Sequence, residues 1–359
     1  MKGKILNYYA GGNTARGFVS FYSSILQNVN NVYVLNGYGD RFSTKVLKII
    51  GNEYLAKGYD IEVINSTVDI EALEGIVIPE KSVAVVVEKG IHGENLASAH
   101  PNVKYIDLKG AFDLKAINAK HSVVTEKTNK ILAKFKEAHN CFDIALKIHD
   151  EWEKIYISNM DFSKANTLTN EIIDMLLGNA PNKLSKSNCV VDKYLGGSTS
   201  IGSHDYVPNI TDGLKRYFIK GRPGTGKSTI LKKIGKRAFE KGYDVEIYHC
   251  GFDPYSLDMI IVRELKFAIF DSTAPHEYFP SEPSDEVIDV YEKLIVAGTD
   301  EKYEVELNDI VKRYKEQVGY GVKKLEDAKI LKDEIEDIYE NAFNEVKGDK
   351  IIKQIKDIL

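Results

Sequence analysis

Short β-prone apolar runs alternate along the chain with apolar residues at helical spacing. Residues 32–50 read as a strand, a glycine-rich turn and a helix. Residues 217–219 begin a second such segment, and strands are expected at residues 244–249 and 267–270. This alternation predicts an α/β fold with a mostly parallel sheet flanked by helices.

Two further stretches, residues 128–140 and 309–343, carry apolar residues three and four positions apart with many charges between them. This pattern is typical of amphipathic helices. We expect a helical tail in each half, packed either on its own sheet or on the other half.

The chain contains an internal repeat. Residues 8–18 match 193–203 at a shift of 185, residues 57–63 match 241–247 at 184, and residues 150–156 match 333–339 at 183. The shared order predicts two tandem domains, 1–184 and 185–359. If the Lys-Glu pairs at 136–137 and 315–316 correspond, the second tail is longer by about one helical turn.

The second half contains the full G-x-x-x-x-G-K-[ST] pattern of a phosphate-binding loop between an expected strand and helix. Glycines let backbone N–H groups face phosphates, and the following helix directs its positive end toward the same anion. Lys227 is expected to bridge the β- and γ-phosphates and Ser228 to ligate Mg²⁺. The expected nucleotide-binding residues are Gly221, Arg222, Pro223, Gly224, Thr225, Gly226, Lys227, Ser228 and Thr229.

A phosphate-binding loop also needs a carboxylate at the end of a neighbouring strand to hold the Mg²⁺ shell. Asp271 follows an apolar run and is the first candidate, with Asp253 as competitor, although Pro254 favours a turn there. His276 either hydrogen-bonds a loop or lines the cleft as a third catalytic residue. His92 corresponds to it in the first half.

The first half has lost the motif at the matching place. At a shift of 184, Ser43 stands where Lys227 stands and Phe42 where Gly226 stands; at 185, Phe42 takes the lysine position. Asp40 adds negative charge, and Val87 corresponds to Asp271 with Glu88 next to it. We therefore expect a catalytically silent first half. Arg41 or Lys45 reaching a phosphate is the weaker alternative.

Composition narrows the class of protein. The 359 residues have a net charge of −5 and a pI near 6.0, which argues against a nucleic-acid-binding protein. Three separate cysteines show no zinc-site spacing, and no apolar run is long enough for a membrane helix. We expect a cytoplasmic protein, with self-association or a protein partner left open.

The stretches at residues 8–24, 221–229 and 252–291 resemble a little-characterised bacterial family of duplicated P-loop ATPases. The resemblance covers most of the chain. It implies two tandem P-loop NTPase domains and ATP binding. Members of that family often have an intact loop in the first half, from which residues 38–43 depart.

The sequence favours an Mg²⁺-dependent ATPase acting at the second loop, with ATP and Mg²⁺ as cofactors. A small-molecule or nucleotide kinase and an ATP-gated scaffold with negligible turnover are the alternatives. No guanine-reading Asn/Thr-Lys-x-Asp motif is present. The candidates for an arginine that assists catalysis are Arg16, Arg41, Arg222, Arg263 and Arg313.

Overall fold

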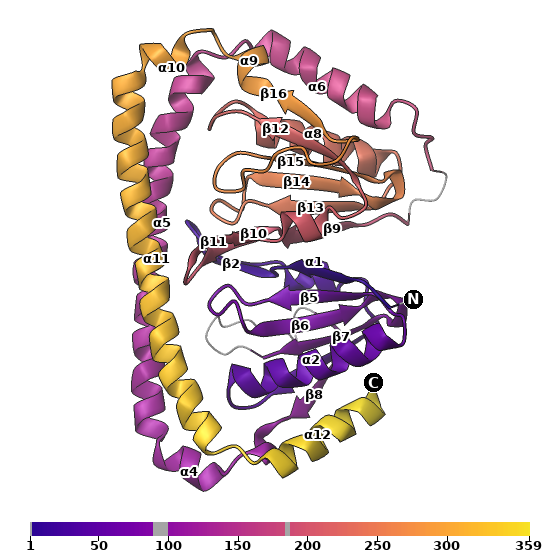
Figure 1. Ribbon diagram of the computed structural model, residues 1–359, viewed down its shortest axis with the longest axis vertical. Helices are drawn as coiled ribbons and strands as arrows, with labels where there is room; N and C mark the ends of the chain where they lie inside the picture. The colour runs from indigo at the N-terminus through magenta and orange to yellow at the C-terminus, as the bar shows by residue number, and fades with distance from the viewer. Residues whose placement is uncertain (1, 89–99, 184–186) are drawn as a thin grey trace.

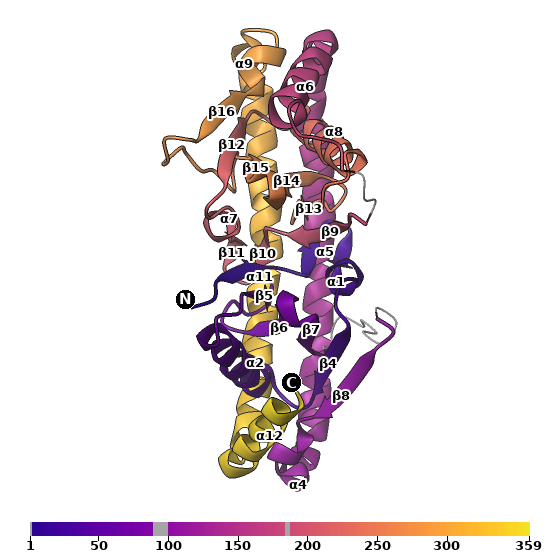
Figure 2. The same ribbon diagram turned by 90° about the vertical axis from the view of Figure 1, so that its right-hand side faces the viewer.

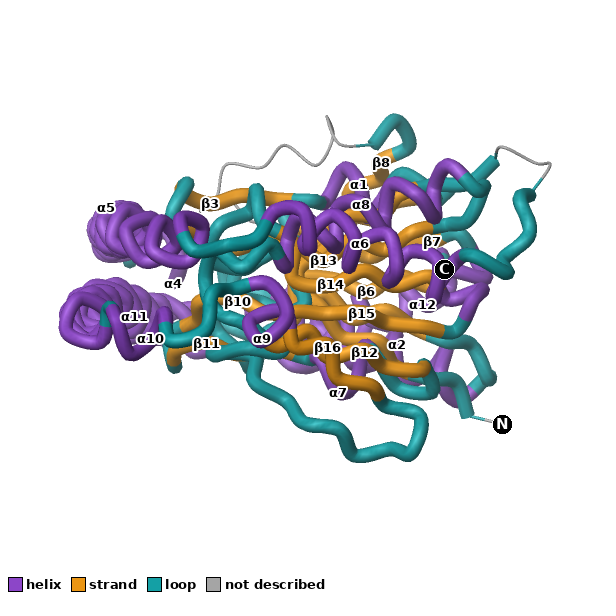
Figure 3. The backbone as a smooth tube through the Cα atoms, turned by 90° about the horizontal axis from the view of Figure 1, so that it is seen from above, coloured by secondary structure: helices purple, strands orange, loops and turns teal. Residues whose placement is uncertain are grey.

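The computed structural model describes residues 2–88, 100–183 and 187–359. Two mixed β-sheets are stacked along one side of a pair of long helices (Figure 1). Figure 3, viewed along those helices, shows the pair standing beside the sheets rather than over their faces. The α/β class expected from the sequence is confirmed.

The first sheet has the strand order β1-β5-β6-β7-β4-β8. Among these described strands, three of the five neighbouring pairs are parallel, and β6 runs against both of its neighbours. Its strands are β1 (Ile5–Tyr8), β4 (Asn31–Asn36), β5 (Ile61–Asn65), β6 (Leu73–Ile78), β7 (Val83–Val87) and β8 (Val103–Asp107).

The second sheet repeats this arrangement in the order β9-β13-β14-β15-β12-β16. Asn31 pairs with Val83 in the first sheet and Lys215 with Phe267 in the second, so the register itself repeats at a shift of 184. The strands are β9 (Val190–Tyr194), β12 (Lys215–Lys220), β13 (Val245–His249), β14 (Leu257–Val262), β15 (Phe267–Asp271) and β16 (Glu286–Asp289).

The repeated Gly-Gly-x-Thr-x-x-Gly segments form hairpins, β2 (Gly11–Thr14) with β3 (Gly17–Ser20) and β10 (Gly196–Thr199) with β11 (Gly202–Asp205). In each, the threonine hydroxyl donates to the carbonyl of the last glycine at 2.7 Å. Those glycines have φ of 89° and 102°, a region that favours glycine. The motif is therefore explained by hairpin geometry.

The two units meet at equivalent residues. Tyr9 and Tyr194, which correspond at a shift of 185, exchange backbone hydrogen bonds of 3.1 and 3.0 Å. One apolar core joins both sheets, with Val34 and Ala84 from the first and Phe218 and Phe270 from the second. The units therefore resemble the two subunits of a symmetric dimer within one chain.

Two helices of equal length form the rod on the left of Figure 1. Helix α5 (His121–Ser158) and helix α11 (Glu304–Asn341) each have 38 residues and correspond end to end at a shift of 183. The expectation of an extra turn in the second tail was wrong, because the Lys-Glu pairs used to align the tails are not equivalent. The helices run antiparallel, as the ion pairs Lys134–Asp327 and Glu151–Arg313 show.

The tails exchange sheets. Helix α6 (Phe162–Leu177), which follows α5, packs with α8 (Lys227–Glu240) on the second sheet. Helix α12 (Glu345–Ile358), which follows α11, packs with α2 (Asp40–Ala56) on the first. Figure 2 shows this exchange at the two ends of the rod. The stretches expected to form the tails, residues 128–140 and 309–343, lie mainly in α5 and α11, which pack against each other beside the sheets rather than on a sheet face. It is the helices that follow them, α6 and α12, that cover the sheet of the other half.

Shorter elements join these layers. They are α1 (Tyr22–Leu26), η1 (Pro79–Lys81), η2 (Lys109–Ala111), α4 (Leu114–Ala119), α7 (Val207–Ile210), η3 (Arg263–Leu265), α9 (Val290–Leu294) and α10 (Thr299–Lys302). Within the described ranges, no helix combines the length and the apolar character needed to cross a bilayer.

Candidate functional site

The second glycine loop, residues 221–226, connects the carboxyl end of β12 to the first turn of α8. Gly224 and Gly226 have φ of 76° and 86°, so the bend depends on glycine. The Arg222 carbonyl accepts hydrogen bonds from the Thr225 hydroxyl at 2.7 Å and the Lys227 ammonium at 2.8 Å. The loop is therefore closed by its own polar groups.

The structure brings Lys227 and Asp271 together. Asp271 pairs with Ile219 across the parallel strands β12 and β15 and ends β15. Its Oδ2 lies 3.5 Å from Lys227 Nζ, and its Oδ1 accepts from the Thr273 N–H and hydroxyl. Asp253 instead lies in a turn, accepts from Arg16 and does not replace Asp271 at the lysine.

The remaining loop residues are placed as follows. The Ser228 hydroxyl accepts from the Leu257 N–H at 3.0 Å, which ties the start of α8 to β14. Arg222 is exposed, pairs with Asp300 at 3.1 Å and lies over the Tyr291 ring. Pro223 is half-buried, Thr225 is buried and Thr229 is exposed.

His276 is buried and held by the second hairpin. Its Nδ1 lies 2.7 Å from Asp205 Oδ2, and Tyr278 donates to the other oxygen of Asp205. Burial disfavours the charged imidazole. The hydrogen bond to Asp205 and the negative charges of Asp258, Asp205 and Asp271 together outweigh burial and raise the pKa of His276. His276 thus lies within electrostatic range of Asp271. His92 lies outside the described residues.

Asp258 on β14 is a site residue that the sequence reasoning missed. Its side chain is buried. Burial is the main cause that raises its pKa, to about 6, and the charge of Asp271 adds to it, while the positive charges of His276 and Lys227 act in the opposite direction. An acidic residue within an apolar strand, matched by Glu74 in the first copy, was the available signal.

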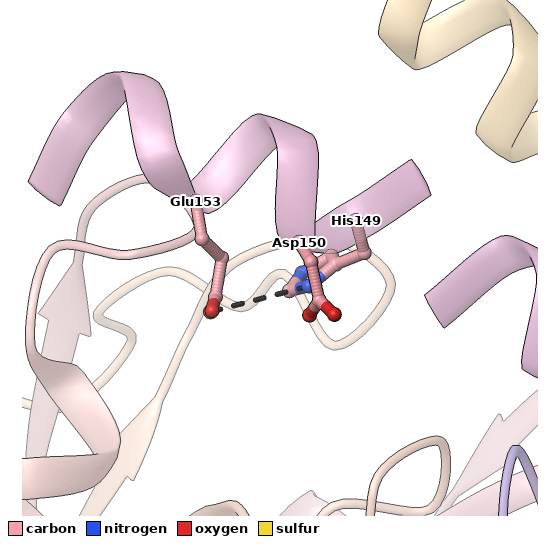
Figure 4. A group of neighbouring side chains, drawn as sticks. All are labelled: His149, Asp150 and Glu153. Carbon is pink, nitrogen blue, oxygen red and sulfur yellow. Dashed lines mark ion pairs between the residues drawn. The ribbon is translucent and has the colours of Figure 1, made fainter. Parts of the chain in front are cut away.

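Helix α5, from the first half of the chain, covers the second loop. A Cβ added to Gly224 would lie 2.6 Å from the carbonyl oxygen of Glu153, so this close approach also depends on glycine. His149, Asp150 and Glu153 present ligand atoms within 4.8 Å of one another (Figure 4). Burial and the charge of Lys227 lower the pKa of His149, and the negative charges of Glu153 and Asp150 oppose this shift.

Only some of the five arginines named as candidates for assisting catalysis lie at the second loop. Arg222 belongs to it, and Arg16 of the first half pairs with Asp253 at 3.4 Å. The others are held elsewhere, Arg41 by Asp337 and Glu340, Arg263 by Glu246, and Arg313 by Glu151 and Asp309. Arg41, one of the five candidates, does not lie at the second loop, because α2 packs on the first sheet.

The corresponding first loop has a different conformation. Helix α2 begins at Asp40, three residues before the position that matches Lys227, while α2 and α8 end at matching residues. The loop before α2 is residues 37–39, against 221–226 before α8. The segment that forms a loop in one unit is therefore the first helical turn in the other.

A carboxylate from α11 occupies the amino end of α2. Glu336 accepts from the backbone N–H groups of Asp40 at 2.7 Å and Arg41 at 3.1 Å. Burial and the charge of Asp40 raise the pKa of Glu336, although these two hydrogen bonds and the charge of Lys332 act to lower it. Glu336 corresponds to Glu153 at the shift of 183, so equivalent residues cover both loops.

The predicted reasons for the loss of the first site need correction. Phe42 does not project into a phosphate position; it is buried against Phe112 and Phe343, with ring centroids 5.9 and 4.8 Å away. Asp40 is not an isolated negative charge, because the buried Lys332 pairs with it. Lys45 pairs with Glu345 on α12.

Comparison of the chain with protein-family models, curated proteins and solved structures finds no match.

Proposed function

We propose that the protein binds and hydrolyses ATP with Mg²⁺ at the second glycine loop. The observation that carries the proposal is the placement of Lys227 at the start of α8, 3.5 Å from Asp271 at the end of the adjacent parallel strand. A ligand at this edge would meet a helix N-terminus, a buried ammonium and a carboxylate together. A cytoplasmic location, expected from the sequence, stays part of this proposal.

The oxygen donors beside Lys227 fit a magnesium site. The Ser228 hydroxyl and the Asp271 carboxylate would hold the ion, which when bound would offset the negative charge of the phosphates. Gly224 and Gly226 let the backbone curve around an anion. Lys227 would exchange its contact with the Arg222 carbonyl for a phosphate oxygen and stabilise the charge that develops during transfer.

The proposal assigns turnover to the second unit alone. In the first unit the N–H groups at the start of α2 already donate to Glu336, and no lysine stands at the matching position. An anion at that place would have to displace a carboxylate that belongs to the chain. We therefore expect the first unit to support the fold and the placement of α11.

The test is phosphate release by the purified full chain with Mg-ATP, compared with Lys227→Ala. We expect this variant to lose at least about 100-fold in turnover, the effect of removing a principal charge-stabilising group. Lys45→Ala is the matched control, because it removes a lysine from the corresponding helix of the first unit, and it should leave turnover unchanged. Equal activity of wild type and Lys227→Ala would refute the site.

The same experiment separates the two alternatives. Release of ADP only when a metabolite acceptor is added would favour a kinase. Tight ATP binding with neither phosphate release nor a phosphorylated product would favour a nucleotide-gated scaffold. Loss of binding in Lys227→Ala is expected in that last case too, so the variant tests the site under each function.

A further inference from the structure

Two carboxylates lie close together at the end of the second sheet. Met259 on β14 pairs with Phe270 on β15, and Ile260 with Ile269, in an antiparallel register. Asp258 precedes Met259 and Asp271 follows Phe270, so both aspartates stand where this paired segment ends. The pairing of β14 with β13 shifts by one residue at Asp258, which marks a bulge there.

Both side chains lie near Lys227. Asp271 Oδ2 is 3.5 Å from Lys227 Nζ. Burial raises the pKa of Asp258, and the nearby charges of Asp271, which raises it, and Lys227, which lowers it, act on the same carboxyl. The two aspartates and Lys227 therefore belong to one cluster at this end of the sheet.

The two aspartates differ in how their oxygens are satisfied. Asp271 accepts from Thr273 through one oxygen and faces Lys227 through the other. Asp258 is 7% exposed, and its Oδ2 has no hydrogen-bond partner anywhere in the described chain. Burying a carboxylate oxygen without a partner is costly, and the charge of Asp271 adds repulsion. The charges of His276 and Lys227 oppose these costs only in part, because the pKa of Asp258 remains raised. A bound cation would offset the rest.

The Ser228 hydroxyl lies beside this pair. It accepts from the N–H of Leu257, the residue before Asp258. Three oxygen donors, two of them carboxylates, thus come from α8, β14 and β15. Oxygen donors of this kind are the ligands of Mg²⁺ and Mn²⁺.

The first unit lacks the pair. The residues at the equivalent positions are Glu74 and Val87, and Glu74 accepts from the Tyr22 hydroxyl at 3.3 Å. A single hydrogen-bonded acid does not require a cation. The pair of carboxylates is therefore specific to the unit that keeps the lysine.

We propose that Asp258 is a direct ligand of the divalent cation at the second site, together with Asp271 and Ser228. This proposal rests on the proposed function for the role of the cation, but cation binding can be measured without nucleotide. It predicts that the site holds the cation before ATP arrives.

The experiment titrates the nucleotide-free full chain with Mn²⁺ and follows free Mn²⁺ by electron paramagnetic resonance. Wild type should bind one Mn²⁺ at this site, Asp258→Asn should bind it at least about tenfold more weakly, and Glu74→Gln should match wild type. Unchanged affinity in Asp258→Asn, or no binding by wild type, would overturn the proposal.

Thermal unfolding gives a second readout. Without metal, Asp258→Asn should unfold at a temperature equal to or above that of wild type, because the substitution removes an unsatisfied buried charge. Mg²⁺ should raise the wild-type midpoint and leave that of the variant nearly unchanged. A variant that is less stable than wild type without metal would contradict the repulsion between the two carboxylates.

These outcomes are separable from those of the proposed function. If wild type binds Mn²⁺ through Asp258 but neither binds nor hydrolyses ATP, the proposed function fails and the cation site stands. If wild type hydrolyses ATP and Asp258→Asn binds Mn²⁺ as wild type does, the cation-ligand proposal fails alone.

Discussion

The two glycine loops occupy equivalent places in equivalent sheets, and each lies under a long helix contributed by the other half. At the second loop the backbone of Glu153 approaches Gly224, and Lys227 faces Asp271. At the first, the carboxylate of Glu336 accepts from the N–H groups that begin α2. Equivalent residues of the two units thus differ in role: the backbone of Glu153 lies beside the second loop, whereas the carboxylate of Glu336 caps the helix that follows the first loop.

The difference teaches how a glycine loop can change its conformation without loss of the fold. The exposed N–H groups at the start of a helix attract anions. In the first unit the chain supplies that anion itself, and three residues of loop are wound into helix. The strand order and register of the sheet are unchanged.

The largest expected effect comes from an attempt to restore the first loop. Phe42→Ala opens the position that matches Gly226, but Phe42 is buried against Phe112 and Phe343. We expect a loss of about 3–5 kcal/mol in the free energy of unfolding and no gain in nucleotide binding. Urea unfolding and ATP titration measure the two quantities.

The matched control is Phe239→Ala on α8, where the side chain is 42% exposed. It should change the free energy of unfolding far less than Phe42→Ala does. New ATP binding by the Phe42 variant would show that the first site is blocked rather than lost.

A smaller effect should separate the two covering glutamates. Glu336→Ala removes the acceptor for two N–H groups of α2, and loss of such a cap costs about 1–2 kcal/mol. Glu153→Ala removes a partly exposed side chain that caps no helix among the described contacts and should cost under about 0.5 kcal/mol. Urea unfolding of both variants at pH 8 checks the order; equal costs would mean that the two loops are covered alike.

The smallest effect is a pH dependence specific to the second unit, because Asp205 corresponds to Ser20 in the first. The raised pKa of His276 means that its pair with Asp205 stabilises the fold fully below the ordinary histidine pKa of about 6.5. That stabilisation is lost as pH rises through the raised value. The pKa of Asp205 is lowered, so the stabilisation that its ionised carboxylate contributes is lost only at acid pH.

Wild type should therefore lose stability as the pH rises above about 6.5 and through the raised pKa of His276, and His276→Asn should remove this fall. The comparison variant is His139→Asn, which removes a histidine whose pKa burial lowers. Thermal unfolding across the pH range measures both. A persisting alkaline fall in His276→Asn would show that another group is responsible.

Much of the local structure follows from the sequence. The apolar run before Asp271 forms a strand whose register brings the carboxylate to Lys227, and the repeated segments mark the duplication. Local periodicity determines these features, so they are visible without a structure.

The features that the sequence did not predict depend on packing between distant segments. The sequence shows that residues 150–156 match residues 333–339. It does not show that Glu153 and Glu336 cover the loops of opposite units. Asp258 was missed because its closeness to Asp271 is visible only once β14 is known to pair with β15. The early start of α2 depends on Glu336, which lies 296 residues away.

The exchange of tails also constrains how the protein is made. Lys45 on α2 and Glu345 on α12 form an ion pair across 300 residues of chain, and Ile352 and Ile355 complete the apolar face of the first sheet. During synthesis, the part of that face beside α2 therefore stays uncovered until the second unit and the whole rod have been translated. Contacts of such long sequence separation slow folding and expose the nascent chain to aggregation.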